Sequence, residues 1–220
     1  MADNRMQLVV ASAALQGAAE GTLVNARGSQ RGDAVVVSTI EQLIDDGRGF
    51  MVSNTARETA EALAGTSFSD TAPAFLLDVP TGTTAKLAEI TMNTGGTVAG
   101  GVITLLVTLS DKLRYSSGGT AKTPQNLSFD EPRTANSSFY TAVSAITAGA
   151  NTDDITLEGA LIDPDVATAP YGAPTKFHWS AKTSYSPQLV GPASVVVYSF
   201  AATTAPSWFY NFKWVEYPTT

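Results

Sequence analysis

The sequence predicts a mainly β protein: an antiparallel β-sandwich, jelly-roll-like, with an N-terminal arm or short helix. Three observations lead to this fold class. β-branched and aromatic residues recur in short runs, 18 Gly and 11 Pro punctuate a chain of 220 residues, and the spacing of runs and turns is regular. All-β sandwiches of this length often fold as one unit, so residues 33–220 are expected to form a single domain.

The first 65 residues combine several patterns. Residues 1–32 are rich in Ala, Gly and Gln and are expected to form the arm. The β-branched run 34–40 predicts a strand, and 49–53 predicts another after the Asp46-Gly47 turn signal. Residues 56–64 have a helix-like composition and end at a glycine.

From Pro73 onward the pattern predicts strands and turns. The expected strands are 74–79, 86–92, 102–109, 155–162, 175–181, 194–200 and 208–217. Residues 102–109 are apolar on both faces, which predicts a central strand covered by other layers. Residues 110–152 are polar and rich in turn residues, which predicts an irregular excursion of the kind that often carries an interface.

The last expected strand places four aromatic side chains on one face. These residues either fill the core, the favoured interpretation, or anchor a subunit interface. The candidate subunit-interface residues are Trp208, Tyr210, Phe212, Trp214, Phe139, Tyr140, and Leu8, Val9 and Leu15 of the arm.

Composition excludes several functional classes. Charged residues make up 15% of the chain, against about 25% in an average protein. With 13 basic and 20 acidic residues, the chain lacks the cationic surface of a free-standing nucleic-acid binder. The chain has no cysteine and a single histidine, so it lacks the residues that thiol catalysis and Cys/His zinc sites require. We therefore expect no enzyme, no cofactor and no metal, and the short apolar runs predict no membrane span.

The sequence contains three weaker signals. His178 is expected on the polar face of its strand, where a surface role is the ordinary one. The pairs Asp153-Asp154 and Asp163-Pro-Asp165 offer oxygen ligands for a cation, but their spacing does not match an EF-hand. Arg31-Gly-Asp33 spells an integrin tripeptide that recurs by chance.

The apolar run before Ala11-Ser-Ala13 is too short for a signal peptide, so synthesis in a host cytoplasm is expected.

Two sequence motifs mark the ends of the expected β domain. Gly32-Asp-Ala-Val-Val-Val-Ser38 opens it and Trp214-Val-Glu-Tyr-Pro218 closes it, around a body rich in Thr, Ala and Gly. In these features the chain resembles the small β-rich virion structural proteins of tailed bacteriophages. The resemblance implies a capsid-associated decoration or cement subunit located in the virion.

The expected partners follow from this resemblance and from the weakly charged surface. A surface with few charges suits a subunit whose faces are covered on assembly. We expect a homo-oligomer such as a trimer, bound to the major capsid protein or another virion protein, with neither nucleic acid nor membrane as partner.

Two alternatives stay open at this stage. One is a major capsid subunit or a tail or fibre subunit. The other is a β-sandwich module that binds a glycan receptor through exposed aromatic residues such as Tyr115, Phe139, Tyr140 or Tyr171.

Overall fold

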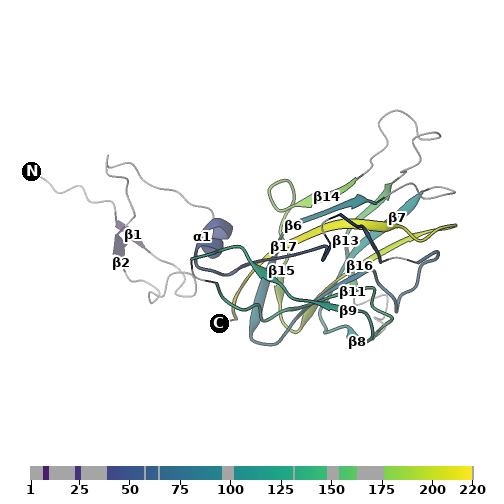
Figure 1. Ribbon diagram of the computed structural model, residues 1–220. Helices are drawn as coiled ribbons and strands as arrows, with labels where there is room; N and C mark the ends of the chain where they lie inside the picture. Colours follow the sequence, from purple (N-terminus) through teal and green to yellow (C-terminus); the bar gives the residue numbers. More distant parts are fainter. Residues whose placement is uncertain are drawn as a thin grey trace, which may run out of the picture.

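Two antiparallel sheets pack face to face in the computed structural model, which confirms the predicted β-sandwich (Figure 1). The structure describes residues 7–9, 23–25, 39–56, 58–63, 65–95, 102–130, 132–147, 154–162 and 176–219. Every ladder between the described strands is antiparallel. The sandwich therefore has one interior and two outer faces, and the outer faces are where a partner can bind.

The six-stranded sheet has the order β13-β7-β16-β5-β11-β9. Its strands are β5 (Phe75–Val79), β7 (Ile103–Ser110), β9 (Thr120–Lys122), β11 (Ser138–Thr141), β13 (Asp154–Ile162) and β16 (Ala193–Ala201). The predicted strand 102–109 is thus confirmed as an interior strand, with β13 and β16 on its two sides.

The seven-stranded sheet has the order β10-β3-β17-β6-β14, with β15 paired to β6 and β4 paired to β17. Its strands are β3 (Gly49–Ser53), β4 (Glu61–Ala62), β6 (Thr83–Thr94), β10 (Gln125–Asn126), β14 (Lys176–Ser180), β15 (Gln188–Val190) and β17 (Ser207–Pro218). Two further pairs lie outside these sheets: β1 (Gln7–Val9) with β2 (Leu23–Asn25), and β8 (Tyr115–Ser117) with β12 (Ala145–Ile146).

The aromatic residues of β17 form the centre of the core between the sheets. Trp208, Tyr210, Phe212 and Trp214 are buried, and the Phe75 ring of β5 lies 4.7 Å from the Tyr210 ring and 4.9 Å from the Phe212 ring. Phe139 is buried in the same cluster. These five side chains are closed inside the chain itself, so their candidacy as subunit-interface anchors is wrong and the favoured core interpretation is correct.

Helix α1 (Thr39–Asp45) occupies the end of the run 34–40 that was predicted to be a strand. The turn signal after it is real, but it ends a helix. The N–H of Arg48 donates to the carbonyl of Leu43, the N–H of Gly47 donates to that of Ile44, and Gly47 has a φ of 71°. This is a Schellman C-cap, which favours glycine at the left-handed position. Residues 34–38 lie outside the described part of the chain.

The helix-like composition of 56–64 was misleading. The described residues of that range form bends and the short strand β4, which pairs with the start of β17. Such a short segment gains little from helix propensity alone, so a tertiary contact decides its structure. The range 110–152 was expected to be irregular, yet it supplies five short strands, β8 to β12.

Candidate functional site

At one end, the outer face of the six-stranded sheet carries apolar side chains that are exposed (Phe68, Leu161) or half-buried (Leu106, Phe200). Register places Phe200, Thr104 and Leu161 in one row across β16, β7 and β13, with Leu106 in the next row. Phe68 lies over this end, with its ring 5.1 Å from that of Tyr198 and 5.8 Å from that of Phe200. Phe68 is 51% exposed and Leu161 64% exposed. We call Phe68, Leu106, Phe200 and Leu161 the apolar patch.

Strand β13, which carries Leu161 of the apolar patch, forms the edge of the sheet. It pairs with β7 on one side, and no other described strand pairs with it. Ile155 is 69% exposed, and the register shifts between Thr156 and Glu158. A bulge and a charged residue are devices that limit uncontrolled edge pairing. The edge of β13 is therefore accessible, but its bulge and its charged residue disfavour uncontrolled strand pairing.

The opposite end of the same outer face is polar and buried. Asp154, Ser110, Ser194 and Asp78 form one row across β13, β7, β16 and β5. Arg114, just before β8, is buried over this row.

Arg114 ties the segment before β8 to this polar row. Its Nη1 lies 2.5 Å from Asp154 Oδ2, and its Nε donates to the carbonyl of Thr147 at 2.5 Å. The backbone N–H of Tyr115 donates to Asp78 Oδ2 at 3.0 Å. Breaking a buried ion pair costs much unfolding free energy, so this cluster holds the segment that contains Arg114 against the outer face of the sheet.

Between these two ends, the outer face carries a second hydrophobic cluster. Leu76, Val196 and Tyr198 of the sheet pack with Val143 and Ile146 of the excursion. The rings of Tyr115 and Tyr140 stack at a centroid distance of 3.9 Å. Tyr140 is thus a partly buried member of this intramolecular cover.

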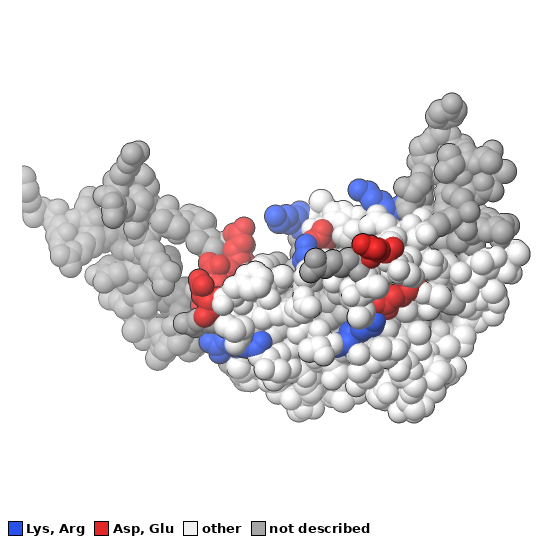
Figure 2. Space-filling model, in the orientation of Figure 1, with Lys and Arg blue, Asp and Glu red and all other residues white. Residues whose placement is uncertain are grey.

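The outer face of the seven-stranded sheet has the opposite character. Register aligns Ser53, Asn211, Thr91 and His178 in one row across β3, β17, β6 and β14. The next row contains Met51, Lys213 and Glu89, and Phe209 pairs with Asn93 on the other side. Most of these side chains are polar and half-buried or exposed. Figure 2 shows one face of the molecule, on which charged side chains are sparse and most described atoms are uncharged.

Glu89 organises the charges of this polar face. Its carboxylate lies 2.6 Å from Lys213 Nζ and 3.1 Å from His178 Nε2. The hydrogen bond from Lys213 lowers the pKa of the Glu89 carboxyl, against a smaller opposing effect of burial. His178 is exposed on the polar face of β14, as expected, while Phe177 and Trp179 point into the core.

A second ion pair joins Glu61 of β4 to Lys122 of β9. Lys122 Nζ is 2.8 Å from Glu61 Oε2, and the backbone N–H of Thr55 donates to Glu61 Oε1 at 2.9 Å. Burial opposes ionisation of Glu61, but the hydrogen bonds and the charge of Lys122 outweigh it and lower the pKa of the carboxyl. Burial and the nearby Glu61 raise the pKa of Tyr210.

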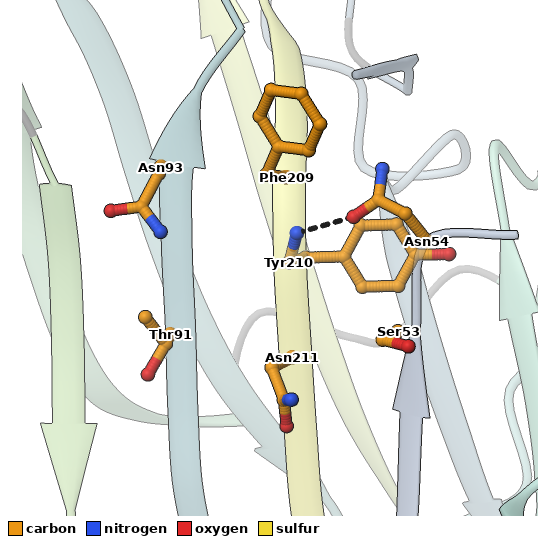
Figure 3. Close-up of a pocket in the computed structure, with 7 residues that line it drawn as sticks. All are labelled: Ser53, Asn54, Thr91, Asn93, Phe209, Tyr210 and Asn211. Atoms are coloured by element: carbon orange, nitrogen blue, oxygen red, sulfur yellow. Dashed lines mark hydrogen bonds between the residues drawn. The ribbon is translucent and has the colours of Figure 1, made fainter. Parts of the chain in front are cut away.

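A shallow hollow of about 270 Å³ lies on the polar face (Figure 3). Asn93 and Thr91 line it from β6, Phe209 and Asn211 from β17, and Ser53 and Asn54 from the end of β3. Asn54 Oδ1 accepts a hydrogen bond from the backbone N–H of Tyr210 at 2.7 Å, and Asn54 Nδ2 donates to the carbonyl of Trp208 at 2.8 Å. The Asn54 side chain thereby continues the sheet beyond the last residue of β3.

The remaining sequence candidates have other outcomes. Leu8 and Val9 belong to β1, and Leu15, Tyr171, Asp153, Asp163, Asp165 and Arg31 to Asp33 lie outside the described residues. Asp154 is the ion-pair partner of Arg114. Within the described ranges, no three His, Asp or Glu side chains are grouped to hold a metal ion, and no helix is long and apolar enough to cross a membrane.

Sequence reasoning missed the apolar patch and the Arg114 cluster. The available signal for the patch was the adjacent pair Leu161 and Ile162, because neighbouring residues of a strand point to opposite faces and only one of the two can enter the core. Comparisons with protein-family models, with curated proteins and with solved structures found no match.

Proposed function

We propose that the chain is a structural subunit of a bacteriophage virion, a decoration or cement protein that stabilises the shell through contacts between subunits. In this role it has no catalytic residue, and its partners are copies of itself and the major capsid protein. The resemblance of the two end motifs and the low charge content support the virion assignment.

The observation that carries the proposal is the apolar patch beside the open edge of β13. Exposed apolar surface that is contiguous, and rimmed by polar residues, marks a site of protein contact. Phe68, Leu106, Phe200 and Leu161 come from a loop and three adjacent strands, so a rigid sheet presents them together. A subunit that docks through this patch leaves the polar face of the other sheet in solvent.

Leu161→Glu tests the contact directly. The substitution places a charge within the proposed interface, while Leu161 in the free chain is mostly exposed. We expect the variant to fold normally and to lose binding to shells produced without the protein, measured by co-sedimentation. Shells reconstituted with the variant should then rupture under heat or osmotic shock as readily as bare shells.

Asn93→Glu is the matched control, because it adds the same charge to an exposed strand position on the opposite face. We expect Asn93→Glu to bind and protect shells like the unsubstituted chain. Equal binding by both variants, or unprotected shells with the unsubstituted chain, would contradict the proposed role.

The sequence alternatives make different predictions in the same experiment. A major capsid subunit would leave no shell when it is omitted, and a tail or fibre subunit would be absent from purified shells. The glycan alternative would use exposed aromatic residues. Of those named for it, Phe139 is buried, Tyr115 stacks on Tyr140 but keeps an exposed side, and Tyr171 lies outside the described residues.

A further inference from the structure

The hollow on the polar face has a lining suited to a hydroxyl-rich, uncharged ligand. Its side chains are the carboxamides of Asn54, Asn93 and Asn211, the hydroxyls of Ser53 and Thr91, and the ring of Phe209. A carboxamide both donates and accepts hydrogen bonds, and so does a sugar hydroxyl. None of these six side chains is charged.

Part of this lining is held in place and part is available. Asn54 is fixed by its two hydrogen bonds to the backbone of β17. Ser53 and Asn93 make no side-chain hydrogen bond to another described residue, and the Phe209 ring stacks on no other described ring. A ligand can therefore use Ser53, Asn93 and the ring of Phe209 without breaking existing contacts.

The surroundings of the hollow argue against other ligand classes. The nearest charges in the next row, Glu89 and Lys213, neutralise each other at 2.6 Å. An anion or a nucleic acid would need cationic groups in the lining. Tyr210 also borders the hollow but its side chain is buried in the core, so an apolar peptide would find little more than the Phe209 ring to contact.

We infer that this hollow binds a neutral carbohydrate chain, with one sugar ring over Phe209 and its hydroxyls on the side chains of Asn93 and Ser53. A volume of about 270 Å³ is small for a drug-like ligand but suits one ring of a longer chain. The site lies on the sheet face opposite the apolar patch, so a subunit docked through the patch would hold it in solvent. The inference does not depend on the virion assignment.

Titration of the full chain with neutral oligosaccharides tests the site. The probes are oligomers of glucose, galactose, mannose and N-acetylglucosamine, followed by ¹H–¹⁵N NMR, in which asparagine side-chain amides give their own signals. We expect saturable shifts of the Asn54, Asn93 and Asn211 side-chain amides with at least one oligomer. A dissociation constant on the order of 0.1–1 mM is expected for such an open site.

Two substitutions then locate the binding energy. Phe209→Ala and Asn93→Asp should each weaken binding about tenfold, which corresponds to about 1.4 kcal/mol. Asn93→Asp is nearly isosteric and exposed, so it keeps the test valid if Phe209→Ala disturbs the sheet. Phe68→Ala, an aromatic deletion on the apolar patch, is the matched control and should leave the affinity unchanged.

Several results would overturn the inference. The absence of saturable shifts with every neutral oligomer at high millimolar concentration is one, and shifts confined to residues away from β3, β6 and β17 are another. Equal weakening by Phe68→Ala would remove the assignment to this face. Binding restricted to sulfated or uronic glycans and abolished by salt would show charge attraction in place of the proposed contacts.

Discussion

The two outer faces of the sandwich belong to sheets of similar size and opposite chemistry. On the six-stranded sheet, a polar row lies beneath Arg114, an apolar row lies beneath the excursion, and the apolar patch is left exposed. On the seven-stranded sheet, the outward side chains are mainly polar, and their charges are paired at the surface. The two outer faces therefore differ in polarity. The outer face of the six-stranded sheet is covered in part by the chain itself, and we propose that a partner covers the rest.

The largest expected difference between the faces concerns their ion pairs. Arg114→Met removes a buried cation and leaves Asp154 without its partner, which should cost about 3–5 kcal/mol of unfolding free energy. Lys213→Met breaks the half-exposed pair with Glu89 and should cost less than about 1 kcal/mol. Urea denaturation of both variants measures the difference. Similar losses would mean that the two faces do not differ in the way described.

Deletion of outward apolar and polar side chains should show a smaller contrast of the same sign. Leu76 points to the outer cluster and is fully buried, so Leu76→Ala should cost about 2–5 kcal/mol. Thr91 occupies an outward position on β6, and Thr91→Ala should change stability by no more than about 0.5 kcal/mol. Thermal unfolding followed by circular dichroism is sufficient. A small effect of Leu76→Ala would show that the excursion does not cover the sheet tightly.

The smallest expected effect is on the pH dependence of stability. The pKa values of Glu61 and Glu89 are lowered from an ordinary value of 4.5, so both carboxylates stabilise the fold fully above that pH. This stabilisation is lost as the pH falls through the lowered pKa values. Each pair is partly exposed and should contribute less than about 1 kcal/mol.

Substitution of the two carboxylates assigns this pH dependence. Glu61→Gln and Glu89→Gln should each flatten the fall in unfolding free energy below pH 4.5, because glutamine does not titrate. Parallel denaturation curves between pH 3 and 6 provide the measurement. An unchanged slope in both variants would place the acid sensitivity elsewhere.

Local pattern predicted the long strands from residue 74 onward, but not β8 to β12 or β15, because period-2 alternation and turn residues act over a few neighbours. It also favoured a core role for the aromatic residues of β17. Helix α1 escaped prediction because Ile40 ends a β-branched run, while the Schellman cap that selects the helix involves backbone bonds at Gly47. The pairing of β4 with β17 similarly overrode the composition of 56–64.

The surfaces escaped prediction for a different reason. Arg114 meets Asp78, Ser194 and Asp154 only when four strands are in register, and no local pattern specifies that register. Leu161 is exposed because β13 is the last strand of its sheet. The apolar character of 102–109 did predict a covering layer on both sides. The other sheet covers the inner side, and the excursion covers part of the outer side.

The central claim, that the chain docks through the apolar patch, is tested most directly by hydroxyl-radical footprinting of the free chain and of the assembled particle. Phe68 and Leu161 report on the patch, and Met51 and Phe209 report on the polar face. The account predicts that labelling of Phe68 and Leu161 falls several-fold on assembly while labelling of Met51 and Phe209 is unchanged. Protection of the polar face with continued labelling of Phe68 and Leu161 would contradict it.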